Sequence, residues 1–253
     1  MSKFNFDNVI AVRKNKKIYR DGDRVMKVFN SDYSKTDVLN EALNQARVET
    51  TGLNIPKILE VTQTKDGECV IVTEFVEGKT LQQLMEENPD EKDKYMEMFI
   101  KLQLEICSNK CTLLTKLKDK MTNKIELANI DSATKYELRT RLEGIARQNQ
   151  LCHGDFIPSN VILKEDGSLY ILDWAHATQG APCCDCARTY LTFCLDDDFE
   201  TPNQYLEMYC NLSGVPTRNI QRWLPIVAAS QSVKNVPEER ELLLSWINVQ
   251  DFE

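Results

Sequence analysis

The stretch LCHGDFIPSNVILKEDGSLYILDW, residues 151–174, combines turn residues with two short apolar runs. Asp155 is followed by Asn160 five positions later, and Asp173 comes thirteen positions after Asn160, at the end of the run LYIL. The pair Asp166-Gly167 between the apolar runs predicts a β-hairpin. Carboxylate and amide oxygens are the ligands that Mg²⁺ prefers, and a carboxylate that binds no metal can accept the proton of an attacking hydroxyl. The stretch therefore predicts a polar site built on a hairpin.

The composition is that of a globular chain with a large core. It has 253 residues, of which 42% are hydrophobic and 28% charged, and a net charge of −8, which argues against nucleic acid as a partner. No apolar run has the length of a membrane span, and the opening MSKFNFDNVI lacks the apolar region of a secretory signal. The nine cysteines are odd in number and irregularly spaced, which favours reduced thiols. We expect a cytoplasmic protein with neither a membrane nor a nucleic-acid partner.

The first 76 residues predict a small β-rich unit. Short β-favouring runs occupy residues 8–12 and 24–29, with a basic connection between them. A helix is expected over residues 34–52, capped by Ser34, with Leu39, Ala42, Leu43 and Ala46 at helical spacing. A hairpin with an Asp66-Gly67 turn is expected over residues 57–76.

From about Gly78 onward the pattern is mainly helical. Apolar residues at helical spacing predict helices over residues 95–106, 117–125, 185–195, 202–212, 217–230 and 237–247. The expected architecture is α+β, with a β-rich N-terminal lobe over residues 1–76 and a larger, mainly helical lobe over residues 77–253. A cleft between two lobes is a common ligand site.

Several motifs resemble those of the aminoglycoside phosphotransferase and choline kinase group, within the protein-kinase-like bilobal fold. HGD at residues 153–155, with an Asn five positions after the Asp, resembles H-R-D-x-x-x-x-N, and DWA at residues 173–175 takes the place of D-F-G. VMKVF resembles the strand with the phosphate-binding Lys, VTEFVEG resembles the hinge, and APCCDCAR resembles the segment with an Asp before a helix. The resemblance covers about residues 9–195.

This resemblance implies a nucleotide site for ATP or GTP. Lys27 is expected to neutralise the α and β phosphates, and Glu41, fourteen residues later, to orient Lys27. Glu49 on the same helix is a rival for that partner. The backbone of the hinge is expected to face the adenine, which adds three nucleotide-binding residues: Glu74, Phe75 and Val76.

The resemblance also assigns roles in phosphoryl transfer. Asp173 and Asn160 are expected to hold Mg²⁺, and Asp155 to orient and deprotonate the acceptor hydroxyl. His153 and Asp185 are expected to support the loop that carries Asp155.

Two departures from protein kinases bear on the substrate. The first hairpin lacks a glycine-rich loop, so Lys14–Lys17 either cover the phosphates by charge or form a solvated turn. Gly154 stands where protein kinases have Arg, and only eleven residues separate Asp173 from Asp185. No long activation segment fits there, so a small-molecule acceptor is favoured over a protein.

A cationic acceptor is expected from the acidic segments of the second part of the chain. These are Asp196, Asp197, Asp198 and Glu200; Glu238, Glu239 and Glu241; and VQDFE at residues 249–253. Each segment is alternatively a solvated surface. Choline or ethanolamine is a second possibility, with rings from Tyr205, Tyr209, Trp223 and Trp246, unless these pack in the core. Sugars, a protein kinase-like activity and a non-catalytic nucleotide-binding regulator are the remaining alternatives.

Overall fold

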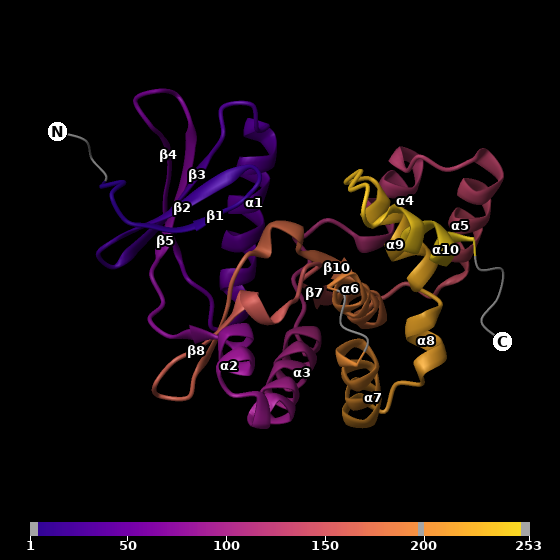
Figure 1. Ribbon diagram of the computed structural model, residues 1–253. Coiled ribbons are helices and arrows are strands. Elements are labelled where there is room, and N and C mark those ends of the chain that lie inside the picture. The colour runs from indigo at the N-terminus through magenta and orange to yellow at the C-terminus, as the bar shows by residue number, and fades with distance from the viewer. Residues whose placement is uncertain (1–4, 197–199, 249–253) are drawn as a thin grey trace. The chain divides into compact units, whose positions relative to one another are not determined.

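The computed structural model describes residues 5–196 and 200–248. The chain forms two compact units: the first comprises Met1–Pro89 with Pro158–His176, and the second comprises Asp90–Ile157 with Ala177–Glu253. Strands dominate the N-terminal part and helices the C-terminal part, as the sequence predicts (Figure 1). The lobe boundary at residues 76 and 77 stays a prediction.

A five-stranded antiparallel sheet forms the centre of the first unit. Its order is β1-β2-β3-β5-β4, and the strands are β1 (Val9–Val12), β2 (Lys16–Asp21), β3 (Arg24–Phe29), β4 (Ile58–Gln63) and β5 (Cys69–Glu74). The β4–β5 hairpin was predicted, and Gly67 in its turn has a φ of 87°, which glycine adopts without strain. Strand β2 was not predicted, because its basic residues obscure the alternation of apolar and polar side chains that marks a strand. The expectation that these residues only connect two strands is therefore wrong.

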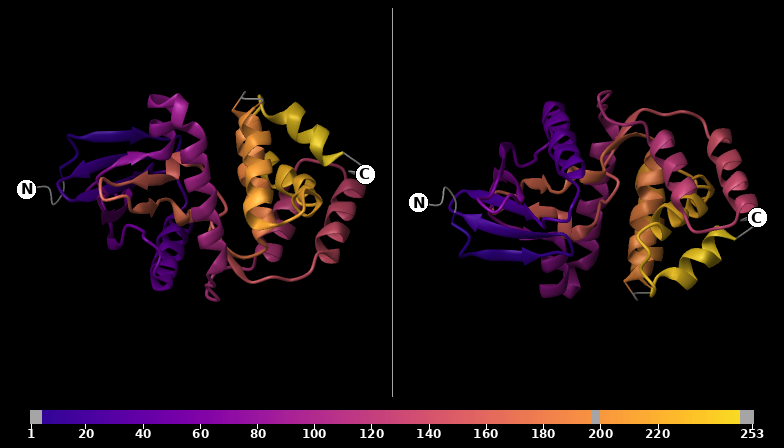
Figure 2. Two further views of the ribbon diagram at one scale, coloured as in Figure 1. Left: turned by 90° about the horizontal axis from the view of Figure 1, so that it is seen from below. Right: turned by 90° about the horizontal axis from the view of Figure 1, so that it is seen from above.

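Helix α1 (Lys35–Val48) packs on one side of this sheet (Figure 2). The Oγ of Ser34 caps the helix by accepting the Asp37 N–H. Val38 and Ala42 join a buried cluster with sheet residues, whereas Leu39 and Leu43 are exposed. The expectation that Leu39, Ala42, Leu43 and Ala46 form one buried face is therefore wrong in part. The face of α1 that is buried also contains polar residues. Glu41 is one of them.

The central polar hairpin belongs to the first unit. Strands β6 (Lys79–Thr80), β8 (Val161–Leu163) and β9 (Leu169–Ile171) form an antiparallel sheet in the order β6-β8-β9. The turn between β8 and β9 contains Gly167, with a φ of 82°, which confirms the predicted hairpin. Helix α2 (Leu81–Glu87) begins at a capping box formed by Thr80 and Gln83.

The second unit is a helical assembly around two short paired strands. Strands β7 (Gln150–Cys152) and β10 (Thr178–Gly180) are antiparallel. The helices are α3 (Lys92–Ser108), α4 (Leu117–Leu127), α5 (Ser132–Gly144), α6 (Pro182–Leu195), α7 (Thr201–Ser213), α8 (Thr217–Gln221), α9 (Leu224–Ser232) and α10 (Arg240–Ile247). The predicted helix over residues 217–230 is divided into α8 and α9.

Buried aromatic rings hold the second unit together. Phe99 of α3 stacks on Phe156 with ring centroids 4.3 Å apart, and Phe193 meets Tyr205 edge to face at 5.3 Å. Because Phe156 directly follows Asp155, this stacking anchors the loop that carries the candidate base. Within the described ranges, no helix combines the length and the apolarity needed to cross a bilayer.

Candidate functional site

Lys27 and Glu41 form a buried ion pair in the first unit. Lys27 lies in the middle of β3 and Glu41 on the sheet-facing side of α1, and Lys27 Nζ lies 2.8 Å from Glu41 Oε1. Burial by itself lowers the pKa of Lys27, but the carboxylates of Asp173 and Glu41 outweigh it and raise that pKa above its usual value. The rival Glu49 instead accepts the backbone N–H of Ile58 at 2.8 Å. The predicted pair is therefore present, and its role toward a nucleotide stays a prediction.

Lys16 joins this pair, which sequence reasoning did not foresee. Ile18 is the cross-strand partner of Lys27, so Lys16 and Lys27 lie on the same face of the sheet. Lys16 Nζ lies 3.2 Å from Glu41 Oε1 and 3.5 Å from Asp173 Oδ2. Of the basic run, Lys14 and Lys17 are exposed, but Lys16 points inward. The period-2 alternation of β2 is the signal that would have found it.

Asp173 completes what we call the charged cluster: Lys16, Lys27, Glu41 and Asp173. Its Oδ1 lies 3.4 Å from Lys27 Nζ. Asp173 has a φ of 61°, in the left-handed region, where Asp and Asn are the non-glycine residues best tolerated. The turn that follows Asp173 is fixed to helix α1, because Asn44 Nδ2 donates to the carbonyl of Ala175 at 3.2 Å.

Asn160 lies beside Asp173 because of the hairpin register. Val161 pairs with Ile171 across β8 and β9, and one step further the N–H of Leu172 donates to the Asn160 carbonyl at 2.8 Å. The two predicted metal ligands thus flank the same end of the hairpin, thirteen positions apart in sequence but neighbours in the sheet register.

The predicted hinge has little free backbone. The Glu74 N–H donates to the Lys57 carbonyl at 3.0 Å, and the Phe75 N–H donates to the Asp23 carbonyl at 2.9 Å. The guanidinium of Arg20 stacks over the Phe75 ring, 3.6 Å from its centroid. Of the three predicted hinge residues, Val76 is therefore the candidate whose backbone N–H would donate to the adenine ring of the nucleotide.

Asp185 organises the loop before Asp155 in the second unit. It is 3% exposed, and its carboxylate accepts the N–H of His153 at 3.0 Å and that of Gly154 at 2.6 Å. Burial raises the pKa of Asp185, although His153 and these two amides oppose the shift. Fully buried His153 accepts the N–H of Asp155 at Nδ1, 3.3 Å away. Both predicted supporting residues therefore contact the backbone of the loop.

Asp155 has a basic partner that sequence reasoning missed. Its side chain is 28% exposed, and its Oδ1 lies 3.4 Å from Arg188 Nη2. Arg188 follows Asp185 by three positions on α6, so both lie on one face of the helix. The three-residue spacing of Asp185 and Arg188 on a predicted helix is the sequence signal that would have identified Arg188.

The segments that suggested a cationic acceptor have mixed outcomes. Asp197, Asp198 and residues 249–253 lie outside the described residues. Glu239 accepts a hydrogen bond from Gln231 Nε2 at 2.7 Å. The rings proposed for a choline cage are largely in the core: Tyr205, Tyr209 and Trp223 are buried.

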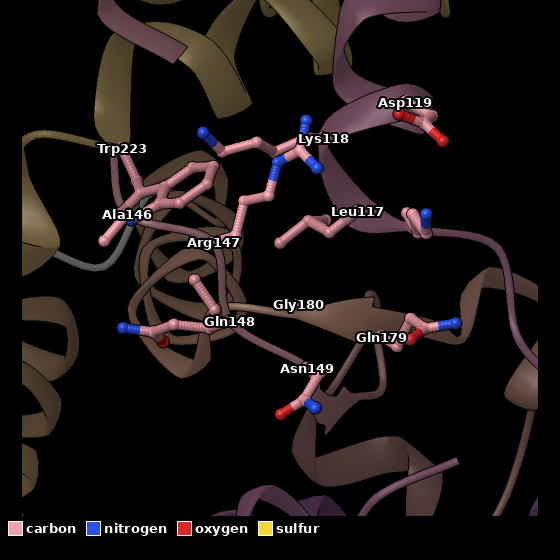
Figure 3. Close-up of a pocket in the computed structure, with 12 residues that line it drawn as sticks. Leu117, Lys118, Asp119, Ala146, Arg147, Gln148, Asn149, Gln179, Gly180 and Trp223 are labelled. Carbon is pink, nitrogen blue, oxygen red and sulfur yellow. The ribbon is translucent and has the colours of Figure 1, made fainter. Parts of the chain in front are cut away.

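A cavity of about 360 Å³ opens at the start of α4 in the second unit (Figure 3). Buried Leu117 and Trp223 form part of its wall, and Lys116, Lys118 and Arg147 supply positive charge. Burial and then the charge of Arg147 lower the pKa of Lys118, which also donates to two carbonyls at the end of α5. Asp119 also lines the cavity, so three of its four charged residues are basic.

Solved structures with the same fold include aminoglycoside phosphotransferases and a choline/ethanolamine kinase family protein. Aminoglycoside phosphotransferase APH(4)-Ia, as a thermostable mutant in complex with AMP-PNP and hygromycin B, has a TM-score of 0.67 at 13% identity, covering 94% of this chain and 89% of that one. The GDP complex of wild-type aminoglycoside 2′-phosphotransferase-IIIa has a TM-score of 0.60 at 16% identity, covering 95% and 90%. A choline/ethanolamine kinase family protein from Mesorhizobium loti has a TM-score of 0.60 at 14% identity, covering 99% and 83%.

The family follows from the sequence itself. The model of the phosphotransferase enzyme family matches residues 7–224. The chain belongs to this family, and it is a phosphotransferase that acts on hydroxyl groups. No curated protein sequence matches it significantly.

Proposed function

We propose that the chain transfers the γ-phosphoryl group of ATP to a hydroxyl of a small molecule. The observation that carries this proposal is the charged cluster, in which Lys16 and Lys27 each lie within 3.5 Å of both carboxylates, those of Glu41 and Asp173. Phosphoryl transfer needs positioning and charge neutralisation above all. Lys27, oriented by Glu41, serves the α and β phosphates, and Lys16 adds a second positive charge on the same face.

The residues present fit a magnesium ion. The carboxylate of Asp173 and the amide oxygen of Asn160 are hard oxygen donors, and Mg²⁺ takes few protein ligands beside water and phosphate. Among the described residues, no group of three or more His, Cys, Asp and Glu is arranged to hold a metal. The candidate site therefore depends on one carboxylate and one amide, completed by the nucleotide. When bound, the ion would neutralise charge on the phosphates.

In the transfer step, the acceptor oxygen forms a bond to the γ-phosphorus, and the bond to the β–γ bridging oxygen breaks. The hydroxyl proton passes to Asp155, and ADP leaves with the bridging oxygen. His153 and Asp185 position the loop that carries Asp155 through the hydrogen bonds described above. The Val76 N–H is the proposed hinge donor to the base.

The identity of the acceptor is the open part of the proposal. Aminoglycosides, choline, ethanolamine and sugars all present a hydroxyl, and two of the three structures above are aminoglycoside phosphotransferases. A cationic acceptor is supported by the acidic segments of the sequence, of which one lies outside the described residues and another only partly within them. A protein kinase has less support, because Gly154 stands where protein kinases have Arg. An inactive regulator has less support, because the chain retains Lys27, Asp155, Asn160 and Asp173.

The test is an ADP-release assay over a panel of hydroxylated acceptors, with Asp155→Asn as the catalytic variant. The variant should lower kcat by about 10²- to 10⁴-fold, the usual contribution of a general base, and leave the Kd for MgATP within about twofold of the wild type. Asp90→Asn, which neutralises an exposed Asp of the second unit, the unit that also carries Asp155, is the matched control and should leave kcat unchanged. An equal loss of nucleotide affinity in Asp155→Asn would refute its assigned role.

A further inference from the structure

The cavity at the start of α4 has walls that hydrogen bonds fasten to one another (Figure 3). Gln179 Nε2 donates to the carbonyls of Thr112 and Leu114 at 2.8 and 2.6 Å, which ties β10 to the segment before α4. Lys118 Nζ donates to two carbonyls at the end of α5, which ties α4 to that end. The cavity is therefore pre-formed, and its volume of about 360 Å³ is that of a small-molecule site.

Helix α4 begins at this cavity, and no side chain caps its first turn. The N–H groups of Leu117, Lys118 and Asp119 have no acceptor within the ranges that the structure describes. The first N–H groups of a helix carry partial positive charge and favour anions. Asp119 belongs to this turn, but Figure 3 shows its side chain on the other side of the α4 ribbon from Lys118. The donors at the start of α4 are thus available to an anion from outside.

Trp223 adds a donor from the opposite part of the wall. This residue is 3% exposed and lines the cavity, yet its indole N–H meets no acceptor among the described residues. A buried indole N–H usually has a hydrogen-bond partner, and leaving one unpaired is costly. Because this N–H belongs to the wall of a cavity, a ligand oxygen can supply the missing acceptor.

Two cations of the cavity have no carboxylate partner in the described part of the chain. The side chains of Arg147 and Lys116 make no hydrogen bond or ion pair there. Lys118 keeps one of its three N–H donors after binding the two α5 carbonyls, and Figure 3 shows its side chain and that of Arg147 extending into the same region. Burial and then the charge of Arg147 lower the pKa of Lys118. An anion between these two side chains would offset their repulsion.

The remaining wall is apolar, which bears on the shape of a ligand. Leu117, Ala181 and Trp223 are buried and line the cavity. Leu117 packs directly on Gly180 of β10, where a Cβ would lie only 2.3 Å from the Cβ of Leu117. Inorganic phosphate would leave this apolar wall uncovered, so a ligand that fills the cavity has an apolar body beside its charge.

The cavity lies apart from the residues proposed for phosphoryl transfer. Gly180 pairs with Gln150 at the cavity end of the β7–β10 ladder. Thr178 pairs with Cys152 at the other end, which leads into the loop that carries Asp155. None of the residues assigned above to the nucleotide, the metal or the acceptor hydroxyl lines the cavity.

We propose that this cavity binds a small organic anion, a carboxylate on a flat apolar ring system, at a site separate from that of phosphoryl transfer. The carboxylate accepts from Arg147, from the indole N–H of Trp223 and from the start of α4, and the rings lie against Leu117. The fork of N–H groups of Arg147 matches the two oxygens of a carboxylate. The inference does not depend on the proposed function, because this ligand is neither the nucleotide nor the acceptor.

The test compares compounds that share one ring system and differ in charge. Binding of 2-naphthoate, 2-naphthamide and 2-naphthylmethylamine to the full chain is measured by calorimetry near pH 7. The carboxylate should bind about tenfold or more tightly than the neutral and cationic compounds. It should also bind more tightly than 2-naphthyl phosphate, which carries a different anion, and than acetate, which lacks the rings. Saturating MgADP should leave its Kd unchanged.

Variants connect the binding to the cavity. Arg147→Gln should lower the affinity for 2-naphthoate by about 10- to 100-fold, the effect of one charge-assisted hydrogen bond. Trp223→Phe keeps an aromatic wall but loses the N–H, and should lower this affinity about three- to tenfold. Lys65→Gln removes the same charge from the exposed β4–β5 turn of the first unit and should have no effect. The Tm of each variant reports its folding, and Arg147 is exposed, so its replacement leaves the core intact.

Each contrary result overturns a stated part of the inference. Equal affinities of the three naphthalene compounds would show a cavity without preference for an anion, and tighter binding of the phosphate ester would refute the carboxylate. Unchanged affinity in both Arg147→Gln and Trp223→Phe, or competition by MgADP, would show that the ligand binds elsewhere. Binding of 2-naphthoate as expected, in a chain that phosphorylates no acceptor, would refute the proposed function and support this inference.

Discussion

Replacing Glu41 by Gln isolates the contribution of the charged cluster. The Glu41 carboxylate is 5% exposed and lies 2.8 Å from Lys27 Nζ and 3.2 Å from Lys16 Nζ. The amide keeps the shape of the side chain but removes the charge. The two ammonium groups then retain one carboxylate, that of Asp173, at the longer distances of 3.4 and 3.5 Å.

The magnitude follows from this geometry. Removing one partner of a buried ion pair costs about 3–5 kcal/mol. Asp173 retains part of the neutralisation, and both lysines keep some contact with water, so we expect a loss of about 2–3 kcal/mol. In a chain of this length each kcal/mol lowers Tm by about 2–4 °C, which gives a fall of about 4–12 °C. The KM for MgATP should rise as well, because Lys27 loses the partner that orients it.

The assay is thermal unfolding near pH 7 without nucleotide, followed by steady-state kinetics. Glu49→Gln is the matched control: Glu49 accepts the Ile58 N–H, and glutamine keeps an oxygen that can do the same. Its Tm and its KM for MgATP should stay close to those of the wild type. Equal shifts in the two variants, or no shift for Glu41→Gln, would refute the reasoning about the cluster.

Three further predictions concern single side chains. Lys16→Met should raise the KM for MgATP about tenfold, since one cation leaves the cluster, whereas Lys17→Met on the exposed face should not; equal effects would contradict the role of Lys16. Asp185→Asn leaves one of two loop amides without an acceptor and should lower kcat about 10- to 100-fold, measured by ADP release; an unchanged kcat would count against it. Lys120 has a pKa lowered to about 8, so it carries its proton below pH 8 and loses it above. Its acetylation rate, followed by mass spectrometry, should reach half its maximum near pH 8; a midpoint near the usual 10.5 would contradict the burial that lowers the pKa of Lys120.

The hairpin and its acidic end were accessible from sequence because local signals agree. Apolar runs on either side of Asp166-Gly167 specify the strands, and the register then brings Asn160 next to Asp173. The ion pair of Lys27 with Glu41 was accessible only through the resemblance, since a lone lysine in a strand carries no such information. The structure brings the two residues together independently of that resemblance.

Other features depend on tertiary packing that no local pattern records. The face of α1 that is buried includes Glu41 and leaves Leu39 exposed, the reverse of what hydrophobicity predicts, because the carboxylate meets two lysines of the sheet. Lys16 was obscured by the neighbouring basic residues of β2.

The left-handed backbone conformation of Asp173 restricts which amino acids this position tolerates. Glycine, asparagine and aspartate tolerate a φ of 61°, and of these only aspartate offers a charged oxygen ligand. A mutational scan of this residue would therefore mix two defects, because alanine or any bulkier side chain disturbs the main chain as well as removing the ligand. Asparagine is the interpretable substitution, and intolerance to all others would by itself say nothing about chemistry.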